Sequence, residues 1–418
     1  MTASAALTPL KRGNLLSRKL DLRTGRPVWF AYRAPKVPTS QLRRDIKTDV
    51  LIVGMGISGA MLAEALTARG HSVVAIDRRG PLKGSTPATT ALVQFEIDQP
   101  LTKLIPMIGR QKAERAWRRS RLAVANLRDR IEETGIDCRL ADRQSLYLAG
   151  DVLSPTALRA EGKAREAAGI AGTCLTKSQL RDRFRIDRDG ALLSYGNLAL
   201  DPRRLTAGLL LEAAERGARF YAPSEAAGFE TGGKAVVVAT KDGPVIEAGH
   251  VVLATGYELL DIVPSRNHRI ISTWAIATRR QPRNIWPHAA FLWEASDPYL
   301  YMRTTTDGRV ICGGEDEDFS DEERRDELIA RKSARISAKL GRLFPGLDTE
   351  PEYVWAGAFG TTSTGLPYIG ALPGHPRIHA VMGYGGNGIT YAQIASELVA
   401  TALDGGEDAD ADLYALPG

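Results

Sequence analysis

Cysteine is scarce in this sequence. The chain has three cysteines among 418 residues, Cys138, Cys174 and Cys312. Their number is odd, they lie far apart, and they lack the short spacing that zinc-binding motifs show. We therefore expect free thiols, no disulfide framework and no metal site, and we take the reducing cytoplasm as the default location.

Long apolar runs are absent as well. No stretch approaches the roughly 20 consecutive apolar residues that a membrane-spanning helix needs. With 44% hydrophobic and 25% charged residues, the composition is that of a folded globular protein. A chain of 418 residues is long enough for two or three domains. The sequence thus predicts a folded protein of two or three domains without a membrane span.

Acidic side chains are scarce at the N-terminus. Residues 1–48 contain eleven Lys and Arg but only two acidic residues, a net charge of +9, whereas the whole chain carries +6. The remaining 370 residues therefore carry −3, and no nucleic-acid ligand is expected for this body. We expect the basic arm, residues 1–45, to lie across its own domain; binding to a partner or to nucleic acid is the alternative. Three aromatic side chains are predicted to anchor it: Trp29, Phe30 and Tyr32.

A strand, a turn, a helix and a second strand follow one another at the start of the body. Asp49 to Val53 is typical of a buried strand, Ala60 to Arg69 of a helix, and Ser72 to Ile76 of a second strand. Gly70 is a good end for the helix. This order predicts a right-handed βαβ unit.

The turn inside this unit carries the sequence Gly54-Met-Gly56-Ile-Ser-Gly59. Between a strand and a helix, this spacing predicts dinucleotide binding. Gly54 permits the tight turn, Gly56 lets the backbone approach a pyrophosphate, and Gly59 lets the helix pack closely on the strand. The N–H groups at the helix start, those of Ile57 and Ser58 among them, favour the negative phosphate.

An acidic residue, Asp77, ends the second strand, and Arg78 follows it. A carboxylate at this point can accept hydrogen bonds from the ribose hydroxyls of an adenosine. It would repel a 2′-phosphate, so NADP is disfavoured. FAD and NAD share this fingerprint, and the βαβ unit alone does not separate them.

The rest of the chain alternates between predicted helices and strands. A meander of strands with a hairpin turn at Asp307-Gly308 is expected from Ile270 to Gly314. Helices are expected over Arg110–Glu133, from Asp201-Pro202 to Gly217, over Asp321–Leu343 and over Ile389–Leu403, and further strands near Phe220, over Ala235–Ala239 and over Val251–Ala254.

Five segments resemble a known family. Val251-Val-Leu-Ala-Thr-Gly-Tyr257 is similar to the apolar run ending in Ala-Thr-Gly of FAD proteins of the glutathione-reductase type, where the turn at Thr255 and Gly256 passes near the adenosine. With four further segments, the chain resembles the D-amino-acid oxidase superfamily, in the branch of glycine, sarcosine and γ-glutamylputrescine oxidases. These segments are Gly84–Leu92, Asp201–Leu205, Trp355–Gly357 with Gly365–Gly370, and Gly383–Thr390.

The resemblance implies an α/β fold with a Rossmann-like FAD-binding domain of the glutathione-reductase type and a second, mixed-sheet substrate domain. FAD would be bound without a covalent link, because Cys312 does not match the linkage segment of sarcosine oxidases. Both domains would be discontinuous. We expect the FAD-binding domain from residues 46–105, 198–262 and 350–405, and the substrate domain from residues 106–197 and 263–349.

The resemblance also implies cofactor contacts. The loop Gly84–Leu92 would lie against the flavin, and the glycine cluster before the last helix would point at its isoalloxazine ring. Backbone N–H groups of this cluster would stabilise negative charge on the reduced flavin. Besides the glycine turn, the predicted contacts are Asp77, Arg78, Ser85, Thr86, Thr90, Ala91, Leu92, Thr255, Gly256, Gly386, Asn387, Gly388, Ile389 and Thr390.

The implied reaction is the oxidation of a small amine or amino acid. Hydride would pass from the carbon bearing the amine to flavin N5 and leave an imine. Arg303 would grip a substrate carboxylate, as an Arg does in similar enzymes, with Tyr301 and Trp274 completing the cage. Phe359 stands where glycine-oxidase relatives carry a second Arg, so an amine without a carboxylate is the alternative. We assign no catalytic residue.

The electron acceptor is O2 or another, unknown molecule. No Lys occurs between Lys241 and Lys332, so the predicted flavin roof lacks the oxygen-activating lysine of sarcosine-oxidase relatives. This favours a dehydrogenase slightly. Two rival functions are an NAD-dependent dehydrogenase, and a non-catalytic flavin-binding protein whose basic arm binds nucleic acid.

Overall fold

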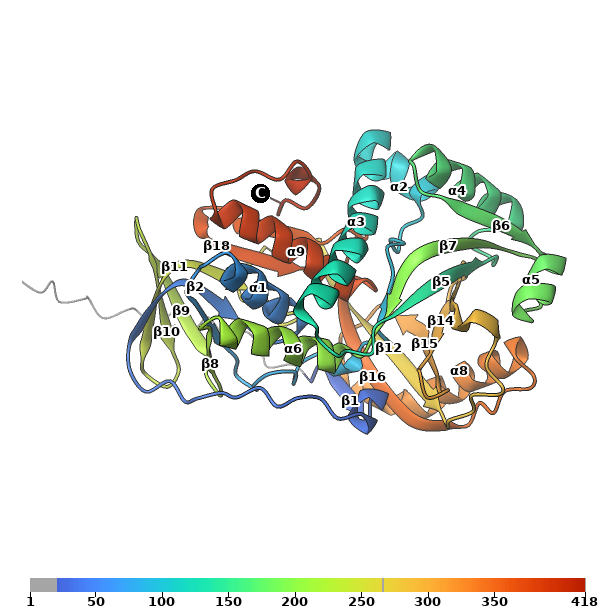
Figure 1. Ribbon diagram of the computed structural model, residues 1–418, viewed down its shortest axis with the longest axis horizontal. Coiled ribbons are helices and arrows are strands. Elements are labelled where there is room, and N and C mark those ends of the chain that lie inside the picture. Colours follow the sequence, from blue (N-terminus) through green and yellow to red (C-terminus); the bar gives the residue numbers. More distant parts are fainter. Residues whose placement is uncertain (1–20, 265–266, 418) are drawn as a thin grey trace, which may run out of the picture.

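Two large β-sheets form the frame of the protein (Figure 1). The structure is a computed structural model that describes residues 21–264 and 267–417. Within these residues, the first sheet has eight strands, with the order β17-β18-β11-β2-β3-β8, and β10 and β9 continue from β11. Its strands are β2 (Ile46–Val53), β3 (Val73–Ile76), β8 (Arg219–Tyr221), β9 (Ala226–Thr231), β10 (Val236–Thr240), β11 (Val245–Leu253), β17 (Tyr368–Leu372) and β18 (His375–Met382).

The centre of this first sheet is parallel and buried. Strands β8, β3, β2, β11 and β18 run in the same direction. The residues of β3 are all buried, as expected for a parallel strand that is covered on both faces. The predicted βαβ unit is confirmed, and its helix begins at Ile57, directly after the glycine turn, rather than at Ala60.

Four helices pack together beside the first sheet (Figure 1). Helix α1 contacts α6 and α9, and α9 also contacts α3. Most side chains of α1 and α9 are buried, so these helices belong to the core shared by the two halves of the protein. The four helices are α1 (Ile57–Ala68), α3 (Arg110–Thr134), α6 (Pro202–Glu215) and α9 (Gly388–Leu403).

The second sheet has ten strands within the described part of the chain. Its order is β1-β16-β12-β15-β14-β13-β5-β7-β4, and β6 pairs with β7. The strands are β1 (Arg23–Gly25), β4 (Leu92–Val93), β5 (Ala141–Leu148), β6 (Gly172–Thr176), β7 (Gly190–Ala199), β12 (His268–Thr278), β13 (Phe291–Glu294), β14 (Leu300–Thr304), β15 (Val310–Glu317) and β16 (Pro351–Thr362). Helices α4 (Pro155–Ala167), α5 (Lys177–Phe184) and α8 (Ile329–Leu343) contact this sheet, while α2 (Leu101–Ile108) packs on α4 and α7 (Glu322–Glu327) packs on α8.

Three expectations about this half need correction. The meander covers only β13, β14 and β15, because β12 lies between β15 and β16. The predicted helix Asp321–Leu343 is two helices that meet at Leu328. Strand β16, which the predicted boundaries assign to the FAD-binding domain, pairs with β1 and β12 and so belongs to the second sheet.

The described part of the arm, residues 21–45, lies across the body as expected. Strand β1 extends the second sheet, and the Trp29 indole donates a hydrogen bond to the carbonyl of Thr89 (2.6 Å). Trp29 and Tyr32 are buried, but Phe30 is 41% exposed. Phe30 is therefore not a buried anchor; the guanidinium groups of Arg23 and Arg203 lie over its ring.

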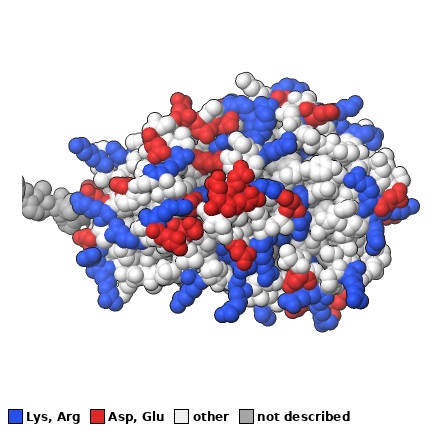
Figure 2. All heavy atoms as spheres, viewed as in Figure 1, with Lys and Arg blue, Asp and Glu red and all other residues white. Residues whose placement is uncertain are grey.

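Charges of both signs are interspersed over the face of the molecule shown in Figure 2. Among the described residues on this face, basic side chains lie between acidic ones rather than in one continuous basic patch of the kind that nucleic-acid binding uses. None of the helices in the described residues is long and apolar enough to cross a membrane.

Candidate functional site

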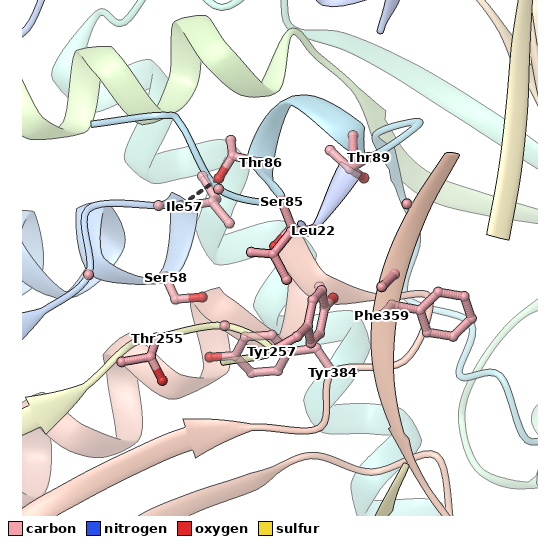
Figure 3. A pocket seen from close by; sticks show the side chains of 18 of the residues that line it. Leu22, Ile57, Ser58, Ser85, Thr86, Thr89, Thr255, Tyr257, Phe359 and Tyr384 are labelled. Carbon is pink, nitrogen blue, oxygen red and sulfur yellow. Dashed lines mark hydrogen bonds between the residues drawn. The ribbon is translucent and has the colours of Figure 1, made fainter. Parts of the chain in front are cut away.

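One cavity is lined by residues from both sheets, from helix α9 and from the arm. At one end lie the glycine turn, the end of β3 and the loop after β11. At the other end lie aromatic side chains of the second sheet, among them Tyr301 and Phe359. Leu22 of the arm also contributes to the wall. Figure 3 shows Tyr257 and Tyr384 side by side in this cavity, with Phe359 across from them.

The glycine turn lets β2 and α1 pack very closely together. Gly54 has φ +113°, and a Cβ atom on it would lie 2.3 Å from the carbonyl oxygen of Ala254. A Cβ on Gly59 would lie 2.0 Å from the carbonyl oxygen of Gly54. Gly59 does not line the cavity, and its role is the close helix–strand packing that the motif predicts.

Gly56 faces open space. A Cβ atom there would meet only the Thr86 hydroxyl oxygen, at 3.2 Å, and that hydroxyl accepts a hydrogen bond from the backbone N–H of Ile57 (3.0 Å; Figure 3). Gly56 is the residue before α1, so the free N–H groups of the first helical turn point toward this space. The arrangement suits a phosphate group.

Asp77 lies at the far end of this space and holds the next turn. One carboxylate oxygen accepts the N–H of Met55 (2.9 Å), and the other accepts those of Arg79 (2.7 Å) and Gly80 (2.8 Å). Each carboxylate oxygen has two lone pairs, so Asp77 can still accept a ribose hydroxyl from the cavity that it lines.

The charged groups beside Asp77 form a network that the sequence did not reveal. Arg78 and Arg79 both pair with Glu258 (2.5 Å each), and Arg78 also pairs with Glu225 (3.3 Å). All four side chains line the cavity. The acidic partners lie far away in sequence, so no local motif could identify them.

We expect Asp77→Asn to weaken FAD binding about tenfold. The amide nitrogen replaces one acceptor oxygen, so one charge-assisted hydrogen bond to the turn or the ribose is lost. The measurement is the FAD dissociation constant, from flavin fluorescence quenching. An unchanged constant would show that Asp77 contributes neither contact; Asp261→Asn, at an exposed position outside the cavity lining, is the control.

The glycine cluster before α9 approaches the cavity as predicted, but one of its N–H groups is occupied. The N–H of Gly386 donates to the Asp98 carboxylate (2.8 Å). Gly388 and Ile389 begin α9 and line the cavity, and the first N–H groups of a helix have no partner within it. These N–H groups can stabilise negative charge.

Side chains of the same segment fix the neighbouring chain. Asn387 donates its amide N–H to the carbonyl of Glu96 (2.5 Å), and the Thr390 hydroxyl donates to that of Gln94 (2.7 Å). Thr390 itself does not line the cavity. Residues 94–98 are therefore held against the start of α9.

Most of the predicted cofactor residues meet in this one cavity. Gly59, Ala91 and Thr390 lie outside its lining. Ala91 has φ +57°, and its carbonyl accepts a hydrogen bond from Arg303. The predicted residues that do line the cavity are Gly54, Gly56, Ile57, Ser58, Asp77, Arg78, Ser85, Thr86, Thr90, Leu92, Thr255, Gly256, Gly386, Asn387, Gly388 and Ile389.

Two of the three predicted substrate residues do not face the cavity. Arg303 is 4% exposed and donates to the carbonyls of Ala91 and Leu200; burial lowers its pKa to about 9. Trp274 donates to the carbonyl of Arg325 (3.0 Å) and lies outside the lining. Both residues are structural, which corrects the predicted cage, and only Tyr301 lines the cavity.

Strand geometry explains these corrections. Successive residues of a strand point to opposite faces, so Thr273 faces the cavity and Trp274 points to the core on the other side. Tyr299, Tyr301 and Arg303 share one face, but the cavity ends at Tyr301. Periodicity gives the face of a strand and not the position at which a pocket ends.

The end of the cavity under the second sheet is aromatic. Trp293 stacks on Tyr147 with ring centroids 3.7 Å apart, and the rings of Tyr299 and Tyr301 lie 5.6 Å apart. Burial raises the pKa of both tyrosines above the ordinary value. Their hydroxyls therefore stay protonated at neutral pH and can donate hydrogen bonds.

Three buried polar groups in the lining fit an FAD molecule. Ser224 Oγ lies near the Asp77 end, and Gln94 Nε2 and Trp293 Nε1 lie in the other half. These residues are 2%, 8% and 9% exposed, and none of the three atoms has a hydrogen-bond partner among the described residues. Buried polar atoms are normally paired, so polar groups of a ligand are expected beside them.

Known proteins share this arrangement. The family described as DAO, FAD dependent oxidoreductase, matches residues 49–402. The γ-glutamylputrescine oxidoreductase of Escherichia coli is 25% identical over 414 residues, 93% of each chain. The probable oxidoreductase OrdL of Haemophilus influenzae is 21% identical over 374 residues, 86% of this chain and 84% of its own.

A solved structure has the same fold. Glycine oxidase from Geobacillus kaustophilus superposes with a TM-score of 0.73 at 22% identity, covering 89% of this chain and 98% of its own. The family match extends over most of the sequence. The chain therefore belongs to the DAO family of FAD-dependent oxidoreductases.

Proposed function

We propose that the protein oxidises a small amine or amino acid to an imine, which water then hydrolyses. FAD, when bound, supplies the chemistry by accepting the hydride at N5. One observation carries this proposal: a single cavity joins the glycine turn to the aromatic end below the second sheet. A cofactor anchored at the turn and a small substrate under the sheet would share it.

The protein's own groups orient the reactants and stabilise charge. The N–H groups of Gly388 and Ile389 provide positive charge at the start of α9. Tyr301 and Tyr299 stay protonated at neutral pH, because burial raises the pKa of both, so neither can take up a proton from a substrate ammonium group. The amine therefore has to reach the cavity as the neutral base, and no side chain is assigned as its general base.

Several features of the proposal stay predictions. The cavity lining contains no Lys among the described residues, which supports an acceptor other than O2. Cys312 is buried in the core and outside the lining, which supports non-covalent binding of FAD. The expected cytoplasmic location and the alternative role of the basic arm, residues 1–45, in nucleic-acid binding also stay predictions; residues 1–20 of the arm lie outside the described part of the chain.

The visible spectrum of the purified protein tests this function. We expect flavin absorption bands that bleach on anaerobic addition of an amine or amino acid, because hydride transfer reduces the flavin. Readmitting air then separates an oxidase, whose bands return within seconds, from a dehydrogenase. A flavin spectrum that no amine or amino acid bleaches, but dithionite does, would contradict the proposed chemistry.

A further inference from the structure

The charges around the cavity are unequally distributed. Two cations, Arg78 and Arg79, line it among the described residues, both at the turn end and both paired with Glu258. At the aromatic end, the charged side chain of the lining is Asp98. The cavity therefore offers negative charge to a substrate and no cation of its own at that end.

Asp98 is fixed in place and faces the cavity. It accepts the N–H of Gly386, and a Cβ on Gly385 would lie 2.4 Å from its carboxylate oxygen. Hydrogen bonds from Asn387 and Thr390 hold the chain on its N-terminal side. Across residues 21–264 and 267–417, no Lys, Arg or His pairs with it: burial raises its pKa, and the N–H of Gly386 opposes that shift. The carboxylate is therefore placed firmly and lacks a positive partner.

A second carboxyl group lies behind the aromatic wall. Burial raises the pKa of Asp316 to about 6, hydrogen bonds from Thr273 and Tyr299 oppose this shift, and the negative charge of Asp98 adds to it. The negative charge of Asp98 therefore reaches the carboxyl group of Asp316. A positive charge beside Asp98 would stabilise its ionised form.

Neither arginine expected for a carboxylate substrate is present at this end. Arg303 points away to backbone carbonyls, and position 359 is a phenylalanine that lines the cavity. A substrate carboxylate would meet Asp98 without a compensating cation, and like charges disfavour binding. A substrate ammonium would meet Asp98 and the faces of Trp293 and Tyr301, which attract cations.

We infer that the substrate is a diamine without a carboxylate, and that Asp98 is the specificity-determining residue that binds its protonated amino group. This inference rests on the proposed amine oxidation. The second amino group enters as the neutral base. A hydride passes to FAD from the carbon atom that bears this amino group, which breaks a carbon–hydrogen bond. The resulting iminium nitrogen then releases one proton to water and becomes a neutral imine. The ammonium held by Asp98 takes no part in bond breaking.

The first test compares ligands on the wild-type holoenzyme. The anaerobic bleaching of FAD is titrated with 1,4-diaminobutane, butylamine, 4-aminobutanoate and glycine. We expect the diamine to half-saturate at a concentration about 10- to 100-fold lower than butylamine, the size of one charge-assisted contact. Stronger binding of 4-aminobutanoate or glycine than of the diamine would overturn the inference.

A second readout needs no turnover. Perturbation of the flavin spectrum by tetramethylammonium and by acetate measures binding of each charge alone. We expect saturable binding of tetramethylammonium and none of acetate at the same concentration; the reverse order would overturn the inference. If no amine bleaches the flavin, the proposed function fails, and this titration still decides the charge preference of the cavity.

Asp98→Asn tests the residue itself. The amide keeps an oxygen that can accept the N–H of Gly386 and removes the charge. We expect the half-saturating concentration of 1,4-diaminobutane to rise about 10- to 100-fold, and that of butylamine to change less than about twofold. Asp261→Asn removes an exposed carboxylate as the control. An equal change in the half-saturating concentrations of both amines would assign Asp98 a structural role. If the variant does not bind FAD, the two ligand titrations of the wild-type protein decide whether the inference holds.

Discussion

Replacement of Gly56 by Asp is expected to give a folded protein without FAD. A Cβ at this position meets only the Thr86 hydroxyl oxygen, at 3.2 Å, and the backbone of Gly56 is extended (φ −82°), so the fold tolerates a side chain. Asp is also a favoured residue before a helix. Its carboxylate, however, would occupy the place of the pyrophosphate, and juxtaposed like charges cost several kcal/mol.

The affinity for FAD should fall by at least about 100-fold, which corresponds to about 2.7 kcal/mol. The flavin-to-protein ratio of the purified variant and the FAD dissociation constant measure this loss. The unfolding midpoint of the apoprotein should stay that of the wild-type apoprotein. Gly56→Ala is the matched control, because it adds the Cβ without the charge. Full flavin content in the Asp variant would show that the pyrophosphate does not bind at this turn.

The second large effect is expected from Glu161→Gln. Glu161 is fully buried on α4. Its carboxylate accepts the N–H groups of Leu101 and Thr102 at the start of α2 (2.9 Å each) and pairs with Arg165 (2.8 Å). The glutamine amide carries no negative charge, so the buried Arg165 loses its counter-charge. The glutamine NH2 group also replaces one oxygen that accepts the hydrogen bonds described above. Loss of one member of such a pair costs about 3–5 kcal/mol.

Urea unfolding of the apoprotein at neutral pH measures this loss of stability. Glu350→Gln is the control, since Glu350 and its partner Arg279 are mostly exposed and such pairs contribute about 0–1 kcal/mol. A Glu161 variant as stable as this control would contradict the assigned role. FAD content should fall with stability, because α2 directly follows the chain that carries Asp98.

The difference between wild type and Glu161→Gln should also depend on pH. Burial alone would raise the pKa of Glu161, but Arg165 and the hydrogen bonds from Thr102 outweigh it, and the pKa lies below the ordinary value. A carboxyl group with a lowered pKa stabilises the fold at pH values above its unfolded pKa, about 4.3. The two stabilities should therefore approach each other as the pH falls through the folded pKa of Glu161.

The cofactor end of the cavity was predictable from sequence because its chemistry is local. Gly54, Gly56 and Gly59 lie within one turn, and each meets a steric or electrostatic demand that a single residue type satisfies. Asp77 follows at the spacing of one βαβ unit. The aromatic end depends on distant pairing: Asp98 reaches the cavity only because the chain before it is held against α9.

The failures concern side chains whose direction depends on where strands end. Trp274 is one residue from the cavity-facing Thr273 and points the other way. Arg303 is two residues beyond Tyr301 on the same face of β14. Its guanidinium contacts backbone carbonyl groups there, because the cavity has already ended. Asp98 could have been considered from the sequence, because the polar residues Gln94, Glu96 and Asp98 alternate with apolar ones, yet its partner Gly386 is 288 residues away.

The position of Leu22 in the cavity wall affects how the basic arm can be studied. Deleting residues 1–45 would remove positive charge from the protein and would also remove Leu22 from the wall, which would open the cavity to water. A truncated protein that lost both nucleic-acid binding and amine oxidation would therefore say nothing about whether the two are connected. Neutralising Lys11, Arg12, Arg18 and Lys19 leaves Leu22 and β1 in place, so only that change separates an electrostatic role of the arm from its role as part of the enclosure.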